Sequence, residues 1–286
     1  MDFATRSLSP HESLIVLALS EQHRREIDRS EVAKTLDISL SAADQLIRSL
    51  RRKGWLERAS WGRYLLIPPD QGPDALGESN LLALASRIAS PYYIGYGTAA
   101  AHYGFTTQLR NVIWLVTPQN LRDRRIQDAQ VRVVKPTQRN FFGFAAVDVY
   151  GYEVTLSDRE KTVIDCLDRP DRAGGVGEAA TILGAASGKL DWLKLAAYID
   201  QIDSPSLARR VGWLADHVAA PMPDEVRERL LRSVTKSGRP PVIGPARPSA
   251  TSIGRDPVWQ VMVTVPAEEL SGSAGLGRRH TVRRGP

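Results

Sequence analysis

Residues 10–70 carry two closely spaced helix-start signals, and these constrain the fold more than any other part of the chain. Asp28 and Glu31 have the spacing of a capping box, in which each side chain satisfies a backbone amide at the start of a helix. Ser41 and Asp44 repeat the pattern after a short break. The helix that begins near Ser41 would be amphipathic, with apolar residues at helical spacing. Its buried face would consist of Ala43, Leu46, Ile47 and Leu50.

Apolar residues at helical spacing around Leu14 and Leu17 predict one more helix before these two. Gly54 predicts the end of the third helix, because glycine adopts the left-handed conformation after a helix without strain. Two β-prone runs then flank a turn that contains Gly62, and Pro68 ends the second run. Three helices followed by a hairpin is the order of a winged helix-turn-helix.

The third helix of such a domain can enter the major groove of DNA and read base edges there. If its apolar face is buried, periodicity places Gln45, Arg48, Ser49 and Arg52 on the opposite face, with Ser41 near the start. Nearby basic residues are better placed for phosphates, which provide affinity without sequence information. These are Arg51, Lys53, Arg58 and Arg63. Winged helices also serve as protein–protein modules, and a basic helix face is often only solvated.

Trp61 lies at the expected hairpin tip. It has two possible roles: contact with the DNA backbone, or local packing.

The length of 286 residues favours two domains, and 42% hydrophobic residues are ordinary for a folded protein. We expect a mixed α+β fold, in which a winged helix-turn-helix precedes a larger domain with a small β-sheet and several helices. The boundaries are residues 1–70 for the DNA-binding domain, 71–78 for a linker, 79–270 for an α/β domain and 271–286 for a basic tail. Strands are expected near 92–94, 112–117, 131–134, 147–150, 152–156 and 258–265. Helices are expected near 80–89, 98–103, 158–167, 176–187, 191–202, 205–218 and 224–234.

The net charge of +6 is concentrated at the C-terminal end, where residues 229–286 hold ten basic and three acidic side chains. Arginines of the tail have two interpretations. They bind DNA phosphates and steepen the salt dependence of binding, or they are only solvated. Those arginines are Arg278, Arg279, Arg283 and Arg284.

Several function classes find no support in the sequence. A single cysteine, Cys166, excludes an intramolecular disulfide, and no two of the five histidines have metal-ligand spacing. Neither a phosphate-binding P-loop nor a nucleophile elbow is present. No signal peptide or membrane-spanning run is visible, so we expect a cytoplasmic protein. We expect no catalytic residue, no metal and no cofactor.

Motifs beyond residue 90 resemble the AbiEi family, antitoxins of abortive-infection toxin–antitoxin pairs. The matching segments are Pro91 to Ile94, Ala99 to Gly104, Ser157 to Asp165, Asp168 to Pro170, Gly174 with Gly175, and Trp259 with Val263 to Pro266. The resemblance implies a transcriptional autorepressor that also counteracts a nucleotidyltransferase-like toxin without a stable complex. The operator of such a repressor is often an inverted repeat read by two copies.

The segment from Ser157 to Asp165 has two interpretations. Asp158 can cap a helix, with Asp165, Asp168 and Arg169 in a polar cluster at its other end. Alternatively, Asp158, Arg159, Asp165 and Arg169 form an antitoxic surface. A different class of function also stays open, namely a ligand-responsive winged-helix regulator without antitoxin activity.

Overall fold

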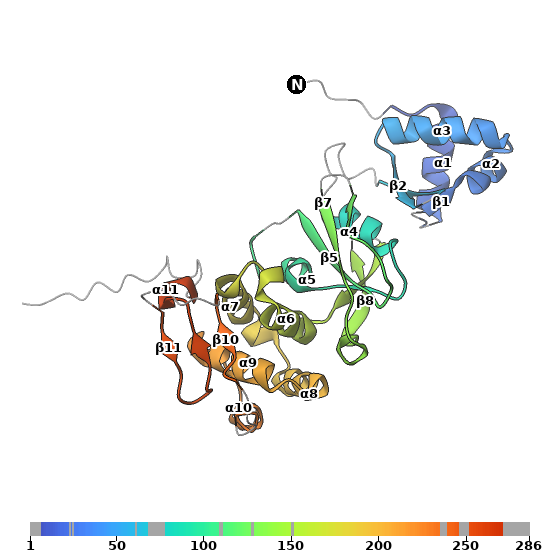
Figure 1. Ribbon diagram of the computed structural model, residues 1–286. Helices are drawn as coiled ribbons and strands as arrows, with labels where there is room; N and C mark the ends of the chain where they lie inside the picture. The colour runs from blue at the N-terminus through green and yellow to red at the C-terminus, as the bar shows by residue number, and fades with distance from the viewer. Residues whose placement is uncertain are drawn as a thin grey trace, which may run out of the picture. The chain divides into compact units, whose positions relative to one another are not determined.

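The computed structural model describes residues 7–22, 24, 26–60, 62–67, 78–108, 111–126, 129–149, 152–234, 239–245 and 252–270 (Figure 1). The fold is mixed α+β, as expected. Two compact units divide the chain: one comprises residues 1–92, 124–131 and 146–155, and the other comprises residues 93–123, 132–145 and 156–286. Among the described residues, no helix combines the length and apolar character needed to cross a bilayer.

The first unit begins with three helices and a three-stranded sheet. The elements are α1 (Pro10–Glu21), β1 (Glu26–Asp28), α2 (Arg29–Leu36), α3 (Leu40–Arg52), β2 (Leu56–Ser60) and β3 (Arg63–Leu66). The hairpin strands β2 and β3 are antiparallel, as expected, and β1 adds to β3 on the other side, giving the order β1-β3-β2. Strand β1 was not expected, because three residues carry too little pattern to identify a strand.

The helix ends in this region follow from local chemistry. The capping box of α2 is confirmed: the Glu31 amide donates to Asp28 at 2.9 Å, and the Asp28 amide donates to Glu31 at 2.9 Å. The prediction that Ser41 caps α3 is wrong, because Ser39 occupies the cap and accepts from the Ala42 amide at 3.2 Å. Gly54 has φ +72° directly after the helix end, as expected.

The helices of this region enclose a small core. Side chains from all three helices, β1 and the hairpin are buried together: Ile15, Val16, Leu19, Ile27, Val32, Ala43, Ile47, Leu50, Trp55, Leu56 and Leu66. Leu46 packs against this cluster while partly exposed. The predicted buried face of α3 is therefore confirmed.

A six-stranded sheet has the order β6-β7-β5-β4-β9-β8. Its strands are β4 (Tyr93–Ile94), β5 (Val112–Val116), β6 (Arg124–Ile126), β7 (Ala129–Val134), β8 (Phe144–Val149) and β9 (Tyr152–Ser157). The central strand β4 pairs antiparallel with β5 and parallel with β9. Helix α4 (Glu78–Ser86) precedes this sheet in the chain, and α5 (Tyr96–His102) follows β4.

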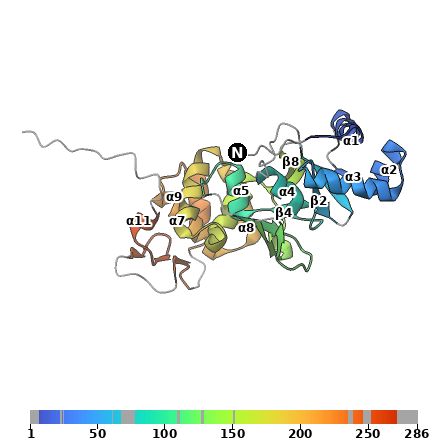
Figure 2. The same ribbon diagram turned by 90° about the horizontal axis from the view of Figure 1, so that it is seen from above.

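Helices dominate the second unit. They are α6 (Arg159–Asp168), α7 (Val176–Ala186), α8 (Trp192–Ile202), α9 (Pro205–His217), α10 (Asp224–Leu231) and α11 (Ala267–Leu270), with short 3₁₀ turns at Gln138–Asn140, Pro170–Arg172 and Ser187–Lys189. Helix α6 contacts α5, α7, α8 and α9 (Figures 1 and 2). Every residue of α6 from Glu160 to Leu167 is buried, as its central position requires.

A small sheet ends the described chain. It is formed by β10 (Val242–Ile243), β11 (Gly254–Arg255) and β12 (Met262–Val263), in the order β10-β12-β11. The expected strand over 258–265 is therefore wrong over most of its length, because residues 257–259 form a turn. That turn places the buried Trp259 against Gly212 of α9. A Cβ added to Gly212 would lie 2.2 Å from the indole ring, so only glycine fits at this position.

Some expectations fall outside the described residues. They concern Trp61, most of the linker and the basic tail.

Candidate functional site

The solvent face of α3 carries a continuous polar row. Ser41, Gln45, Arg48 and Arg52 are all exposed and follow each other at spacings of four, three and four residues. These spacings keep side chains on one side of a helix. The buried residues Ala43, Ile47 and Leu50 lie on the opposite side. Of the predicted base-reading residues, this row contains all but Ser49.

Ser49 and Lys53 have a partner inside the domain. Glu12 is 2% exposed and belongs to the capping box of α1, where its carboxylate accepts from the Ser9 amide at 2.6 Å. The Lys53 ammonium lies 2.7 Å from the same carboxylate, and the Ser49 hydroxyl also donates to it. Both side chains thus link the end of α3 to the start of α1.

The environment of Glu12 favours its ionised form. Burial alone would raise the pKa of this carboxyl. Hydrogen bonds from Lys53, from the amide and hydroxyl of Ser9, and from Ser49 outweigh burial and lower the pKa to about 2. Glu12 is therefore ionised at neutral pH, and its contacts connect α1 to the end of α3. The sequence signal that could have revealed it is the capping-box spacing from Ser9.

The arginines that we expect to contact phosphates lie in the hairpin or just before it. The Arg51 guanidinium lies 5.9 Å from the centre of the Tyr64 ring, and Arg63 contacts Glu26 at 3.3 Å. Arg51, Arg58 and Arg63 are all exposed. These arginines remain accessible to an external anion.

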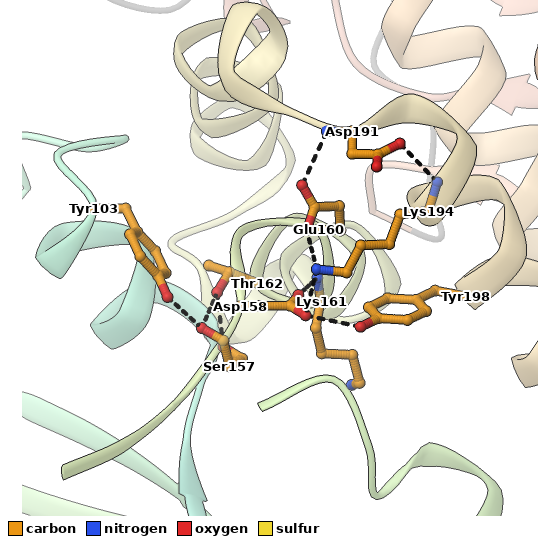
Figure 3. A network of polar contacts seen from close by, with 9 residues as sticks. All are labelled: Tyr103, Ser157, Asp158, Glu160, Lys161, Thr162, Asp191, Lys194 and Tyr198. Carbon is orange, nitrogen blue, oxygen red and sulfur yellow. Dashed lines mark hydrogen bonds and ion pairs between the residues drawn. The ribbon is translucent and has the colours of Figure 1, made fainter. Parts of the chain in front are cut away.

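The start of α6 lies in a dense polar network (Figure 3). Asp158 caps the helix by accepting from the Lys161 amide at 2.8 Å. Its carboxylate also accepts from the Tyr198 hydroxyl at 2.8 Å and contacts the Lys194 ammonium at 3.0 Å. Burial, together with donation to Asp158, raises the pKa of Tyr198 to about 12, so this phenol stays a donor.

Neighbouring side chains complete this network. Glu160 accepts from the Asp191 amide at 3.0 Å and contacts Lys194 at 2.9 Å, which connects α6 to the start of α8. Tyr103 donates to the Ser157 carbonyl at 2.9 Å, and the hydroxyls of Ser157 and Thr162 lie 2.7 Å apart (Figure 3). Glu160 thus joins α6 to α8, the pair of hydroxyls fixes the first turn of α6, and Tyr103 joins the end of α5 to the end of β9.

Asp165 lies deep inside the second unit. Its carboxylate forms an ion pair with Lys161, one helical turn earlier, and accepts from the Tyr93 hydroxyl at 3.1 Å. The Lys161 ammonium donates to the same hydroxyl at 3.2 Å and lies 5.4 Å from the centre of the Phe142 ring. Burial raises the pKa of Asp165, against the lowering effect of Lys161. Asp165 is therefore no surface residue. Lys161 was not among the predicted site residues, although its spacing of four residues from Asp165 indicates an ion pair on one helix face.

The two arginines of the expected antitoxic surface are exposed. Arg159 lies 5.9 Å from the centre of the Tyr103 ring. Arg169 forms a bidentate pair with Asp171, with both distances at 3.0 Å. Within the expected cluster of Asp165, Asp168 and Arg169, each side chain forms an ion pair with a residue outside the cluster. Asp168 lies 3.9 Å from Arg210.

No group of three or more histidine, cysteine or carboxylate side chains in the described part of the chain could hold a metal ion. Cys166 is buried beside Asp165, and burial raises the pKa of its thiol well above the usual range.

Comparison with known protein families gives no match, and comparison with curated proteins gives none either. Among solved structures, the chain is similar to the crystal structure of the RV2827C protein from Mycobacterium tuberculosis. The two share 18% sequence identity over 94% of this chain and 96% of the other, with a TM-score of 0.65. At this identity the similarity shows a shared fold.

Proposed function

We propose that residues 10–67 form a winged helix-turn-helix that binds double-stranded DNA in a sequence-specific manner. The observation that carries the proposal is the exposed row on α3. Gln45 and Arg48 lie in this row, and side chains of these types can form bidentate hydrogen bonds with adenine and guanine respectively. The opposite face of α3 is fixed by its core, so the row is presented on a rigid element.

The arginines around the hairpin would supply affinity without reading sequence. Arg51, Arg58 and Arg63 are exposed cations on the same small domain. Contacts with phosphates release counterions, so binding should weaken steeply as salt increases.

The test is a footprint and a salt titration on the DNA upstream of the protein's own gene. We expect a short protected inverted repeat. Arg48→Ala should cost about 1–3 kcal/mol on the specific site and relax sequence preference. Arg63→Ala should weaken binding to specific and random DNA alike.

Arg229→Ala is the matched control, since it removes the same charge from α10, where Arg229 pairs with Asp200. It should leave both affinities unchanged. Equal losses on specific and random DNA for the Arg48 and Arg63 variants would overturn the assignment of roles.

We further propose that the protein is an AbiEi-like antitoxin that represses its own operon in the cytoplasm. Support comes from the order of the motifs from Pro91 to Pro266. Its counterpart would be a nucleotidyltransferase-like toxin, without a stable complex between the two. Of the expected antitoxic residues, Arg159 and Arg169 are the exposed ones, while Asp165 is buried.

Co-expression with the neighbouring gene product tests this half of the proposal. Wild-type protein should rescue growth, and the double variant Arg159→Ala, Arg169→Ala should rescue poorly if those side chains act on the toxin. Full rescue by the folded double variant would remove them from the antitoxic surface. Absence of rescue by the wild type would favour a ligand-responsive regulator instead.

A further inference from the structure

Helix α1 is apolar on two opposite sides. Ile15, Val16 and Leu19 are buried in the domain core, whereas Leu14 and Leu17 are 54% and 56% exposed. A helix on the surface of a domain normally turns a polar face to water, and one that is apolar all round is normally covered on both sides. The outer side of α1 therefore has the character of an interface.

The outer side forms a regular stripe. Pro10, Leu14, Leu17 and Glu21 are all exposed and are spaced by four, three and four residues. Such spacing is typical of the seam between two packed helices. The stripe is centred between its two leucines, so a two-fold axis at this point would bring Leu14 of one copy against Leu17 of the other.

The helix dipole also favours an antiparallel arrangement of a second copy. Glu21 lies at the C-terminal end of α1, where the last turn holds no basic residue and the helix dipole disfavours an anion. In an antiparallel pair it would face the N-terminal turn of the other α1, where the dipole favours an anion and the turn's own carboxylate, Glu12, is buried and paired with Lys53. In this arrangement the Glu21 carboxylate of each copy lies near a helix N-terminus, where the dipole stabilises an anion.

We propose that the outer face of α1 pairs with the same face of a second copy of this chain in an antiparallel, two-fold arrangement. Two leucines from each copy form a small contact, well below the roughly 1,200 Å² of a stable complex. The pair is therefore weak in free solution. Adjacent half-sites raise the effective concentration of the two copies, so pairing becomes strong on an inverted repeat. This DNA consequence rests on the proposed function, whereas the pairing itself does not.

Sedimentation velocity of the full chain over a concentration series tests the pairing without DNA. We expect reversible self-association of the wild type and at least a tenfold weaker association for Leu14→Gln, Leu17→Gln. Leu193→Gln is the matched control, because Leu193 is an equally exposed leucine of α8, at 50%, and should associate like the wild type. Equal association by the double variant and the wild type would overturn the proposal, as would a wild type that stays monomeric both alone and on DNA.

A cross-linking measurement tests the face directly. The chain has one cysteine, Cys166, and it is buried. An introduced Leu17→Cys is therefore the accessible thiol, and a short bismaleimide should link two copies of this variant in clearly higher yield than two copies of Leu193→Cys. Leu193→Cys should give little linked product under the same conditions. Similar yields from the two variants would count against pairing through α1.

Titrations on one half-site and on the full inverted repeat separate the two proposals. The double variant should bind the half-site like the wild type and lose at least tenfold of the cooperativity on the full site. Wild-type binding to the half-site without cooperativity or self-association overturns the pairing alone. No binding to either DNA, with self-association intact, overturns the DNA proposal and leaves the pairing supported.

Discussion

Each compact unit contains a lysine–carboxylate pair, and the two pairs are built in opposite ways. Lys53 and Glu12 are 41 residues apart in the chain, at the end of α3 and in the first turn of α1, and the lysine side chain remains 28% exposed. Lys161 and Asp165 are neighbours on one helix, and both are buried. The first pair connects two elements at the edge of a small domain, whereas the second lies inside a helical core.

The two carboxyl groups respond to burial in opposite directions. Hydrogen bonds outweigh burial at Glu12 and lower its pKa to about 2, whereas burial outweighs Lys161 and Tyr93 at Asp165 and raises its pKa. Both carboxyl groups have a lysine partner, yet their pKa values shift in opposite directions, so an ion pair alone does not set the direction of a pKa shift. The number of donors to the carboxylate, weighed against the loss of water, sets it.

The largest effect should come from breaking the deeper pair. Lys161→Ala leaves Asp165 without its cation and opens a cavity, which should lower the free energy of unfolding by about 3–5 kcal/mol. Urea denaturation followed by circular dichroism measures the change.

The matched variant Lys161→Met, Asp165→Leu removes both charges while keeping apolar volume, and should lie within about 2 kcal/mol of the wild type. A double variant less stable than Lys161→Ala would contradict the view that the uncompensated charge is the main cost.

The pair at Glu12 should give a smaller effect with a defined pH dependence. The carboxyl has a lowered pKa in the folded state, so its stabilisation is present above its ordinary pKa of 4.5 and is lost as the pH falls towards 2. Glu12→Gln should cost about 2–3 kcal/mol at pH 7 and progressively less between pH 4.5 and 2. Thermal melts of both proteins over this range check the prediction. A difference that stays constant with pH would show that Glu12 contributes through packing.

Asp165 should show the opposite sign. Its raised folded-state pKa means that its contribution is fully present below its ordinary pKa of 3.8 and is lost as the pH rises through the folded value.

The smallest effect is expected at an exposed pair. Arg169 and Asp171 are both well exposed, and such pairs contribute about 0–1 kcal/mol. Arg169→Ala should therefore leave the melting temperature within about 2 °C of the wild type. A larger loss would place Arg169 in the packing of the loop after α6.

The features that local chemistry determines were predictable from the sequence. The Asp28–Glu31 capping box, the buried face of α3 and the glycine after it depend on residues a few positions apart. The cap of α3 was misplaced by two residues, because Ser39 and Ser41 are equally good cap residues and only the backbone distinguishes them.

Features that depend on distant partners were not predictable. Strand β1 exists because it pairs with β3, which lies more than thirty residues later in the chain. The engagement of Ser49 and Lys53 by Glu12 depends on how α1 meets α3, which helical periodicity does not define. The same limit explains the misjudged segment around Trp259, whose conformation serves a contact with α9.

The seating of Trp259 on Gly212 has a consequence for the order in which the chain acquires its structure during synthesis. The indole is buried against α9 and donates to Asp216 at 2.8 Å, so it closes a gap in a core whose helices were translated much earlier. Until that residue has been synthesised, α9 leaves the ribosome with an open notch at Gly212. The helical unit therefore completes its packing only after Trp259 has been synthesised, well after α9, and the growing chain depends on protection of that surface until then.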